Sequence, residues 1–205
     1  MKILTQFILL PGLVFLITLS TGCGSEDNDR EEVTDLLTGK KILMVIAPGK
    51  FRDEELLIPR EIFEWQGAEV TLTATAGGEF KGMFGALAEV ELPLSEIKPA
   101  DYDAVIFVGG SGAQQYWDDP AVHTVAREFQ KESKIIGAIC IAPVILERAG
   151  LLEGRKVAVF HSAAPEIKTG RVTTERIEVD GNIVTGNGPD SAEDFAGAVV
   201  NLLKK

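Results

Sequence analysis

Histidine and cysteine are scarce in this chain. Its 205 residues include two histidines, His123 and His161, and two cysteines, Cys23 and Cys140. These four residues show none of the close spacing that is typical of zinc-binding clusters. The sequence therefore gives little support for a metal site, and it predicts no cofactor.

Positive charge is also in short supply. Twenty lysines and arginines stand against 31 aspartates and glutamates, which gives a formal net charge of -11. A protein that binds nucleic acid needs a basic face to neutralise phosphates. The composition therefore excludes nucleic acid as an expected partner.

The first 22 residues differ from the rest of the chain. Lys2 precedes a nearly continuous apolar run, from Ile3 to Leu19, and small residues follow it. A positive start, an apolar run and a small-residue cleavage site are typical of a signal peptide. Pro11 and Gly12 interrupt the run and disfavour a membrane-spanning helix.

The residues before Cys23 resemble the lipobox of bacterial lipoproteins, in which the cysteine carries a lipid at the mature N-terminus. A lipobox usually has leucine where this chain has Ser20, and Leu19 lies one step earlier, so an ordinary secretory signal cut nearby is the alternative. We predict a lipoprotein-type signal peptide over residues 1–22 and an acidic flexible tether over residues 23–39. The protein would then be exported and held by its lipid on a membrane, facing the periplasm or the cell exterior.

Residues 40–205 suit one globular domain with a substantial core. Short apolar runs typical of buried strands alternate with stretches of helical spacing. Strands are predicted over 42–47, 70–76, 86–94 (an edge strand or hairpin), 101–108, 135–139, 156–160, 176–179 and 183–185, and helices over 53–67, 120–131, 143–150 and 191–203, the last capped by Asp190. This alternation predicts an α/β three-layer sandwich of the flavodoxin-like type, with a mostly parallel sheet and helices on both faces.

Cys140 directly follows the apolar run Ile135–Ile139, and Pro143 opens the next helix. A thiol at this strand-to-helix turn would face the N–H groups and the positive dipole of the helix start, which favours the reactive thiolate. The arrangement is the cysteine counterpart of the nucleophile elbow. If Cys23 carries a lipid, Cys140 is the only free thiol of an exported chain. An inert, buried core cysteine is the alternative.

A glycine turn, Gly109-Gly110-Ser111-Gly112, follows another predicted strand. Ligands of parallel sheets bind beyond the carboxyl ends of the strands, where this turn, Cys140 and the loop after Ala47 converge. The turn lacks the third glycine of a dinucleotide motif and the Gly-Lys-Ser/Thr of a P-loop. Its N–H groups and that of Ile141 could instead form an oxyanion hole for a carbonyl attacked by the thiol. A tight turn without chemistry is the alternative.

Two further groups could assist the thiol. The acidic run Asp53-Glu54-Glu55 opens the first helix, where carboxylates ordinarily complement the helix dipole. A carboxyl beside Cys140 would raise both pKa values, and it would suit a thiolate only if it were protonated and served as a proton shuttle. His161 ends the predicted strand 156–160, which we expect beside the Cys140 strand, so it is the candidate base or orienting group. His123 is predicted on a helix surface or at a cap.

Several stretches, in order, resemble the ThiJ/PfpI superfamily, which includes the Parkinsonism-associated deglycase and shares the class I glutamine amidotransferase-like fold. The resemblance covers residues 40–203. It rests on Glu55-Leu-Leu-Ile-Pro59, Asp101-Tyr-Asp-Ala-Val, Gly109-Gly110, Ala138-Ile-Cys140-Ile-Ala-Pro143, Ala149-Gly-Leu-Leu, and residues 180–189 followed by Phe195-Ala196.

By position, the resemblance implies that Cys140 is the nucleophile and Glu55 its protonated partner. It also implies that Gly110 and Ile141 supply oxyanion N–H groups, that His161 lies near the thiol and that the protein is a homodimer. The chain departs from the family in one place that matters for chemistry. The peptidase-like branch has histidine directly after the cysteine, where this chain has Ile141. The stretch before Glu55 is also longer than usual, which predicts a different pocket rim.

The resemblance implies a cysteine-dependent enzyme that acts on small reactive carbonyls, of the glyoxalase or deglycase type, in stress protection. Three alternatives remain open. Cys140 could sense oxidation, or serve a chaperone-like protein, without turnover. A peptidase or amidase is less favoured because of Ile141. In the last alternative Cys140 is unreactive.

Overall fold

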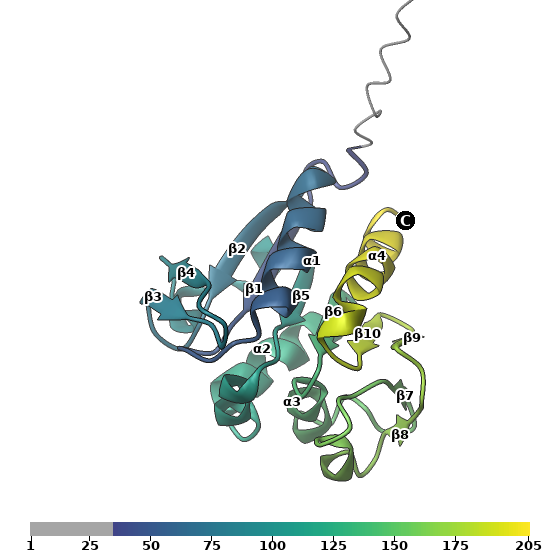
Figure 1. Cartoon of the computed structure of the whole chain (residues 1–205). Coiled ribbons are helices and arrows are strands. Elements are labelled where there is room, and N and C mark those ends of the chain that lie inside the picture. The colour runs from purple at the N-terminus through teal and green to yellow at the C-terminus, as the bar shows by residue number, and fades with distance from the viewer. Residues whose placement is uncertain (1–34) are drawn as a thin grey trace, which may run out of the picture. The chain divides into compact units, whose positions relative to one another are not determined.

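The computed structural model describes residues 35–205 (Figure 1). The predicted signal peptide, the predicted lipidation site Cys23 and most of the predicted tether lie outside the described residues. Leu37 is fully buried, and its N–H donates a 2.8 Å hydrogen bond to the carbonyl of Gln66. Packing of the domain therefore begins before Lys40. Between residues 35 and 205, no helix has both the length and the apolar character that a bilayer crossing requires.

A six-stranded sheet forms the core, in the order β2-β1-β5-β6-β10-β9. All neighbouring strands are parallel except β9, which is antiparallel to β10 and joined to it by the turn at Gly181. The central strands are almost wholly buried, as their continuous apolar runs predict. The six strands are β1 Lys41–Val45, β2 Glu69–Thr73, β5 Ala104–Phe107, β6 Ile135–Ile139, β9 Ile177–Asp180 and β10 Ile183–Gly186.

The four α-helices of residues 35–205 cover the sheet (Figure 1). Helices α1 (Asp53–Trp65) and α4 (Ala192–Leu203) pack against each other, and α4 also packs on β6 and β10. Helices α2 (Pro120–Lys131) and α3 (Pro143–Arg148) pack together on β5 and β6. The structure thus confirms the predicted α/β sandwich with a mostly parallel sheet.

Two small pairs of strands stand outside this sheet. Strands β3 (Gly78–Lys81) and β4 (Leu87–Val90) form an antiparallel hairpin, the second of the two options predicted for residues 86–94. Strands β7 (Lys156–Val157) and β8 (Arg171–Val172) pair with each other in parallel. The hairpin turn matters for the site, because it reaches the N-terminus of α1.

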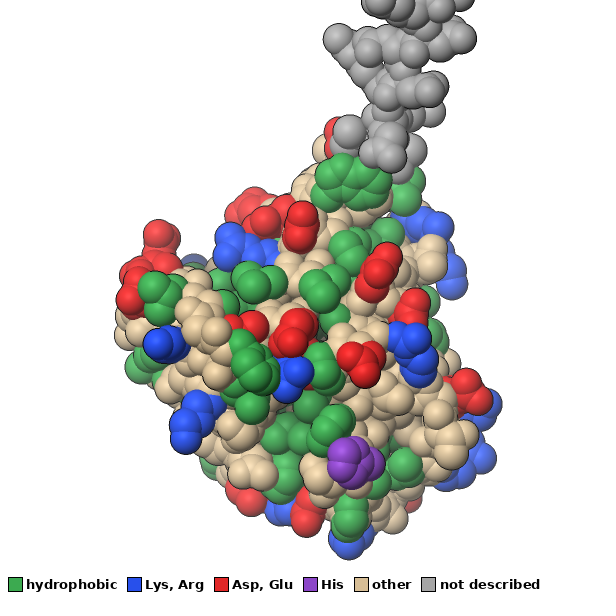
Figure 2. Space-filling view, viewed as in Figure 1, with side chains coloured by type: hydrophobic (Ala, Val, Ile, Leu, Met, Phe, Trp, Pro, Cys, Tyr) green, Lys and Arg blue, Asp and Glu red, His purple; other side chains and the backbone are tan. Residues whose placement is uncertain are grey.

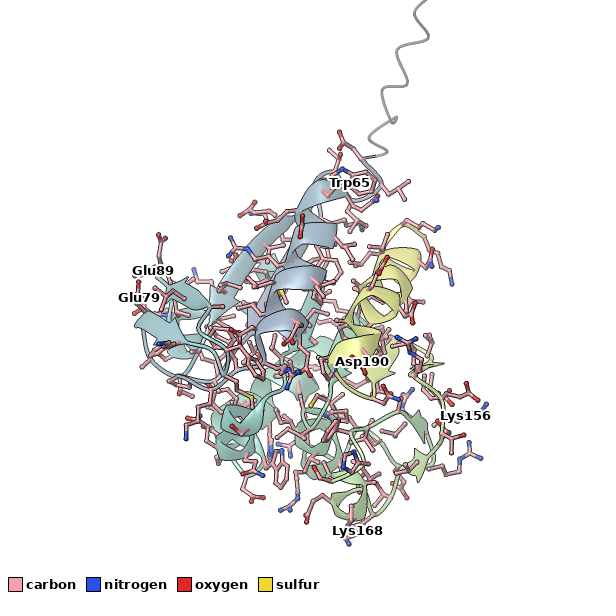
Figure 3. All side chains as sticks on the ribbon, viewed as in Figure 1. Trp65, Glu79, Glu89, Lys156, Lys168 and Asp190 are labelled. Atoms are coloured by element: carbon pink, nitrogen blue, oxygen red, sulfur yellow. The ribbon has the colours of Figure 1, made fainter. Side chains whose placement is uncertain are left out.

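Two local predictions are wrong. The strand over 156–160 does not neighbour β6, because β7 ends at Val157 and the chain then crosses the strand ends, with the N–H of Ala158 bonded to the hydroxyl of Thr185. Asp190 does not cap α4 through its side chain; it lies in a 3-10 turn at the start of that helix (Figure 3). Ser191 holds the capping position instead, and its hydroxyl donates to the carbonyl of Gly188.

The face formed by α1 and α4 carries acidic side chains interspersed with hydrophobic ones (Figure 2). Leu57 and Trp65 of α1 are half exposed there. Scattered exposed apolar residues are normal on a soluble domain.

Candidate active site

Cys140 occupies a strained turn between β6 and α3. Its backbone φ is 64°, in the left-handed region that a side chain disfavours. Its N–H donates to the carbonyl of Gly186 (2.8 Å) and its own carbonyl accepts from the N–H of Phe160 (2.8 Å). These bonds hold the strained conformation from both sides, as is typical of a functional residue. The side chain stays partly accessible, with 7% of the residue exposed.

The glycine turn after β5 allows Cys140 to meet the first helix. A β-carbon at Gly109 would overlap Oε2 of Glu55 and lie 2.6 Å from Cβ of Cys140. Gly110 has a φ of 93°, and any side chain there would collide with the backbone of Arg52. The Gly109 carbonyl in turn accepts the Arg52 N–H at 3.0 Å. Both glycines are therefore required by the close approach of the α1 start to the elbow.

Glu55 is the carboxyl beside the thiol. The residue is 0% exposed, and neither carboxyl oxygen has a hydrogen-bond partner among residues 35–205 by distance and angle. The Cys140 thiol and the Gly109 N–H are close enough to affect its ionisation. Burial nevertheless dominates and raises the pKa of Glu55 to about 7.

The thiol is harder to ionise than the sequence predicts. Burial, followed by the charge of Glu55, raises the pKa of Cys140 to about 12. The N–H groups of Gly110 and Ile141 favour the thiolate but do not overcome these two effects. Ionising both groups would put two negative charges in one buried site, so between pH 7 and 12 the pair carries one charge and one proton.

An open cavity of about 260 Å³ leads to the sulfur. Arg52 and Ser111 contribute polar groups to its wall, and Ile141 and Phe160 contribute apolar ones. The full lining is Arg52, Met83, Gly110, Ser111, Gln114, Cys140, Ile141, Phe160, Ser162 and Pro189. This volume suits a small molecule, and the mixed lining suits one with both a polar and an apolar part.

The structure places the predicted histidine outside this cavity. His161 is exposed, its ring contacts that of Phe160 in a tilted arrangement with centroids 4.3 Å apart, and it lines a neighbouring hollow of about 540 Å³. The two hollows share Phe160 and Pro189 as a wall. His161 is absent from the lining of the Cys140 cavity because β7, the strand before it, lies outside the main sheet and does not run beside β6.

The other histidine is buried, contrary to its predicted surface or capping position. His123 bonds through Nε2 to the carbonyl of Trp117 (2.7 Å), and the Trp117 indole N–H donates to the carbonyl of Ile141 (3.2 Å). This chain of contacts fixes the residue that follows Cys140. Sequence reasoning missed Trp117 because no local pattern connects it with Cys140.

The β3–β4 turn forms part of the rim. The Asp53 carboxylate, in the first turn of α1, accepts the N–H groups of Phe84 (2.9 Å) and Ala86 (2.7 Å). The Met83 N–H donates to the carbonyl of Phe51 (2.9 Å), which brings Met83 to the cavity wall. The acidic run therefore has two roles: Asp53 anchors the β3–β4 turn at the rim of the cavity, and Glu55 lies beside the thiol.

Comparison with known proteins agrees with this geometry. The model of the DJ-1/PfpI family matches residues 40–202. The chain belongs to the DJ-1/PfpI family. An uncharacterized protein from Methanocaldococcus jannaschii is 38% identical over 200 residues, covering 94% of this chain and 95% of that protein. One from Staphylococcus aureus is 32% identical over 170 residues, covering 80% and 99%.

A solved structure resembles the domain closely. The ThiJ/PfpI domain protein from Brachyspira murdochii is 36% identical, with a TM-score of 0.79, and the match covers 80% of this chain and 98% of that one. The chain therefore shares with the DJ-1/PfpI family its α/β fold and mostly parallel central sheet. Among residues 35–205, no group of three or more His, Cys, Asp or Glu side chains is arranged to hold a metal ion.

Proposed function

We propose that this protein is a cysteine-dependent enzyme that acts on small reactive carbonyl compounds, of the glyoxalase or deglycase type. The observation that supports it most directly is the proximity of Cys140, at the base of an open cavity, to the fully buried carboxyl of Glu55, whose oxygens have no well-aligned hydrogen-bond partner among residues 35–205. A buried carboxyl without well-aligned hydrogen bonds lowers the stability of the fold. Groups that are kept at such a cost are often those that take up and release protons in a reaction.

The single proton of the pair gives the site a nucleophile and an acid together. In the resting site the proton lies on the sulfur and the charge on Glu55, since the pKa of Cys140 is the higher of the two. The proton moves to Glu55 as the sulfur attacks, and the N–H groups of Gly110 and Ile141 stabilise the negative charge that this leaves on the sulfur. The sulfur adds to the aldehyde carbon of a 2-oxoaldehyde, and the C=O electron pair moves to oxygen, which takes up the proton of Glu55. The product of this step is a hemithioacetal.

Glu55 is then a carboxylate and serves as the base. It removes the hydrogen of the former aldehyde carbon as a proton and returns it to the neighbouring ketone carbon through an enediol. The result is a thioester of a 2-hydroxy acid, which water hydrolyses to free the thiol. One water is consumed overall and no external oxidant is needed, because the aldehyde carbon is oxidised while the ketone carbon is reduced.

Lactate production from methylglyoxal tests the proposal. We expect purified mature protein to form lactate and both Cys140→Ser and Glu55→Gln to lose at least about 100-fold in kcat, as is usual for loss of a nucleophile or general base. Substitution of the exposed residue Glu61 of α1 by Gln is the control and should leave the rate unchanged. Lactate formation by the wild type that Cys140→Ser matches would contradict the proposal.

Redox sensing is the second candidate, and the same pair supports it. Oxidation of Cys140 to a sulfinate would place two oxygens in the cavity, where a protonated Glu55 could donate a hydrogen bond. Intact mass after mild peroxide treatment separates the two functions: a gain of two oxygens without carbonyl turnover favours sensing. A peptidase has less support, because no histidine lines the Cys140 cavity in the described part of the chain.

We also propose that the protein is exported and anchored through a lipid on Cys23, and that it forms a homodimer. Both ideas rest on sequence resemblance. Export would place the enzyme where aldehydes enter the cell, ahead of cytosolic thiols.

A further inference from the structure

Arg52 is the one cationic side chain among the residues that line the Cys140 cavity in residues 35–205. It precedes α1 directly, at the capping position, and 27% of its side chain is exposed. Its backbone N–H is bonded to the carbonyl of Gly109, so the root of the side chain is fixed to the glycine turn. A positive charge on the wall of a cavity in a protein of net charge -11 is unexpected from composition alone.

The guanidinium is held in a defined orientation. Its Nε and Nη2 bond side-on to the Glu54 carboxylate at 2.8 and 3.2 Å, and the ring of Phe84 lies 4.5 Å from its central carbon. No partner for Nη1 exists among the described residues by hydrogen-bond geometry. The end of the fork, formed by Nη1 and the second N–H of Nη2, is the edge that remains for a ligand.

This edge matches a planar carboxylate better than it matches a point charge. Two parallel N–H donors can bond to both oxygens of a carboxylate, and the geometry adds selectivity to the charge attraction. Glu54 offsets part of the positive charge of Arg52, so the paired hydrogen bonds would supply most of the preference for a carboxylate. Pre-orientation by Glu54 and Phe84 lowers the entropy that binding would lose.

We propose that Arg52 is a specificity-determining residue that binds the carboxylate of a 2-oxoaldehyde carrying an acidic tail, while Cys140 attacks its aldehyde carbon. The inference rests on the proposed function for the reaction but adds the substrate class. One such compound with a short tail is 4,5-dioxopentanoate. Its conversion to 2-hydroxyglutarate follows the same balance as before, with one water added and the tail carboxylate unchanged.

Alkylation of Cys140 tests the carboxylate site without turnover. Iodoacetate and iodoacetamide have nearly the same size, and only the first is charged. In both reactions the sulfur bonds to the methylene carbon, iodide leaves with the electrons of the C–I bond, and the thiol proton is released. The ratio of the two rates, followed by intact mass, therefore reports the attraction of a carboxylate to the cavity.

We expect Arg52→Gln to lower the iodoacetate-to-iodoacetamide ratio about tenfold or more, because charge-assisted paired hydrogen bonds are lost. Arg52→Lys should lie in between, since it keeps the charge and loses the fork. Arg60→Gln is the matched control: it removes the same charge from the outer face of the same helix, where Arg60 pairs with Glu64. Its ratio should stay within about twofold of wild type.

Each outcome decides between the ideas. An unchanged ratio in Arg52→Gln, or an equal fall in Arg60→Gln, overturns the role of Arg52. Failure of both reagents to label Cys140 overturns the proposed function, and the inference with it. Should Arg52→Gln not fold, the ratio in Arg52→Lys, together with its selectivity for 4,5-dioxopentanoate over 2-oxopentanal, decides the matter.

Turnover gives the second readout. Wild type should prefer 4,5-dioxopentanoate to the neutral 2-oxopentanal in kcat/KM, and Arg52→Gln should lose this preference mainly through KM. Turnover of both substrates with no preference in wild type contradicts the inference and leaves the proposed function standing.

Discussion

Glu55 and Cys140 meet across Gly109: a β-carbon on that glycine would overlap Oε2 of Glu55 and lie 2.6 Å from Cβ of Cys140. We therefore predict that Gly109→Ala separates the pair. The free energy of unfolding should fall by about 1 to 3 kcal/mol, as for other overpacked core sites. Alkylation of Cys140 by iodoacetamide should change its pH dependence, because the charge of Glu55 would act from further away.

Gly197 provides the control for this substitution. It lies inside α4, and a β-carbon there would meet no atom within 4 Å. Gly197→Ala should leave the thiol chemistry unchanged and stabilise the fold by up to about 1 kcal/mol, through helix propensity. Equal effects of both substitutions on the alkylation of Cys140 would show that Gly109 is not specifically required for the contact between Glu55 and Cys140.

The raised pKa of Glu55 makes stability depend on pH. The folded protein holds this proton up to about pH 7, against an ordinary value of 4.5. The group therefore favours folding fully below its ordinary pKa, and this contribution disappears as the pH rises through 7. Between about pH 5 and pH 8, wild type should lose about 2 to 3 kcal/mol relative to Glu55→Gln, measured by urea unfolding. Parallel curves for the two proteins would mean that Glu55 is ionised as readily as in water.

Glu147 of α3 should behave in the opposite way. Burial disfavours its charge, but the N–H groups of Thr169, Lys168 and Gly170 outweigh burial and lower its pKa. Its stabilising contribution is present above the ordinary pKa of a glutamate and is lost as the pH falls through the lowered one. We expect Glu147→Gln to destabilise the protein by about 2 to 3 kcal/mol at neutral pH. The exposed Glu153→Gln should change stability little, and chemical unfolding compares the two.

The indole of Trp117 donates a hydrogen bond to the carbonyl of the residue after Cys140. Trp117→Phe keeps most of the packing but removes the N–H that donates to the carbonyl of Ile141. We predict a fall in kcat of about fivefold, the size of one hydrogen bond, with KM nearly unchanged. A substitution that lowered stability and left kcat intact would assign Trp117 to the core alone.

Lipidation is testable in the full chain. Labelled palmitate should enter the wild-type protein and not Cys23→Ser, and the serine variant should leave the membrane fraction. Cys140→Ser should label as wild type does. Label in the Cys23→Ser protein would contradict the anchor, and absence of label in all three would favour an ordinary secretory signal.

The core of the fold could be predicted because its signals are local. The continuous apolar runs at β1, β5 and β6 identify buried parallel strands, and Pro120 and Pro143 mark the starts of two helices. The short β7 could not be placed, because the sequence beyond Val157 stays apolar even though it lies across the strand ends. An apolar sequence indicates burial, but it does not distinguish a strand of the sheet from a segment that crosses the strand ends.

The site was partly predictable for a similar reason. Topology brings Cys140 and the glycine turn to one edge of the sheet, and the resemblance singles out Glu55 among three neighbouring acids. The rim was not predictable, because Met83 comes from a hairpin whose position depends on Asp53. Arg52 directly precedes these three acids in the sequence, and its positive charge was the only available signal.

Asp53 and Glu55 lie two residues apart, yet one secures a small hairpin that takes no part in the main sheet and the other faces the thiol. The rim of the Cys140 cavity can therefore change through the length or the side chains of that hairpin, while Cys140 and Glu55 keep their positions. A change of this hairpin would therefore alter which small molecules enter the cavity without moving Cys140 or Glu55.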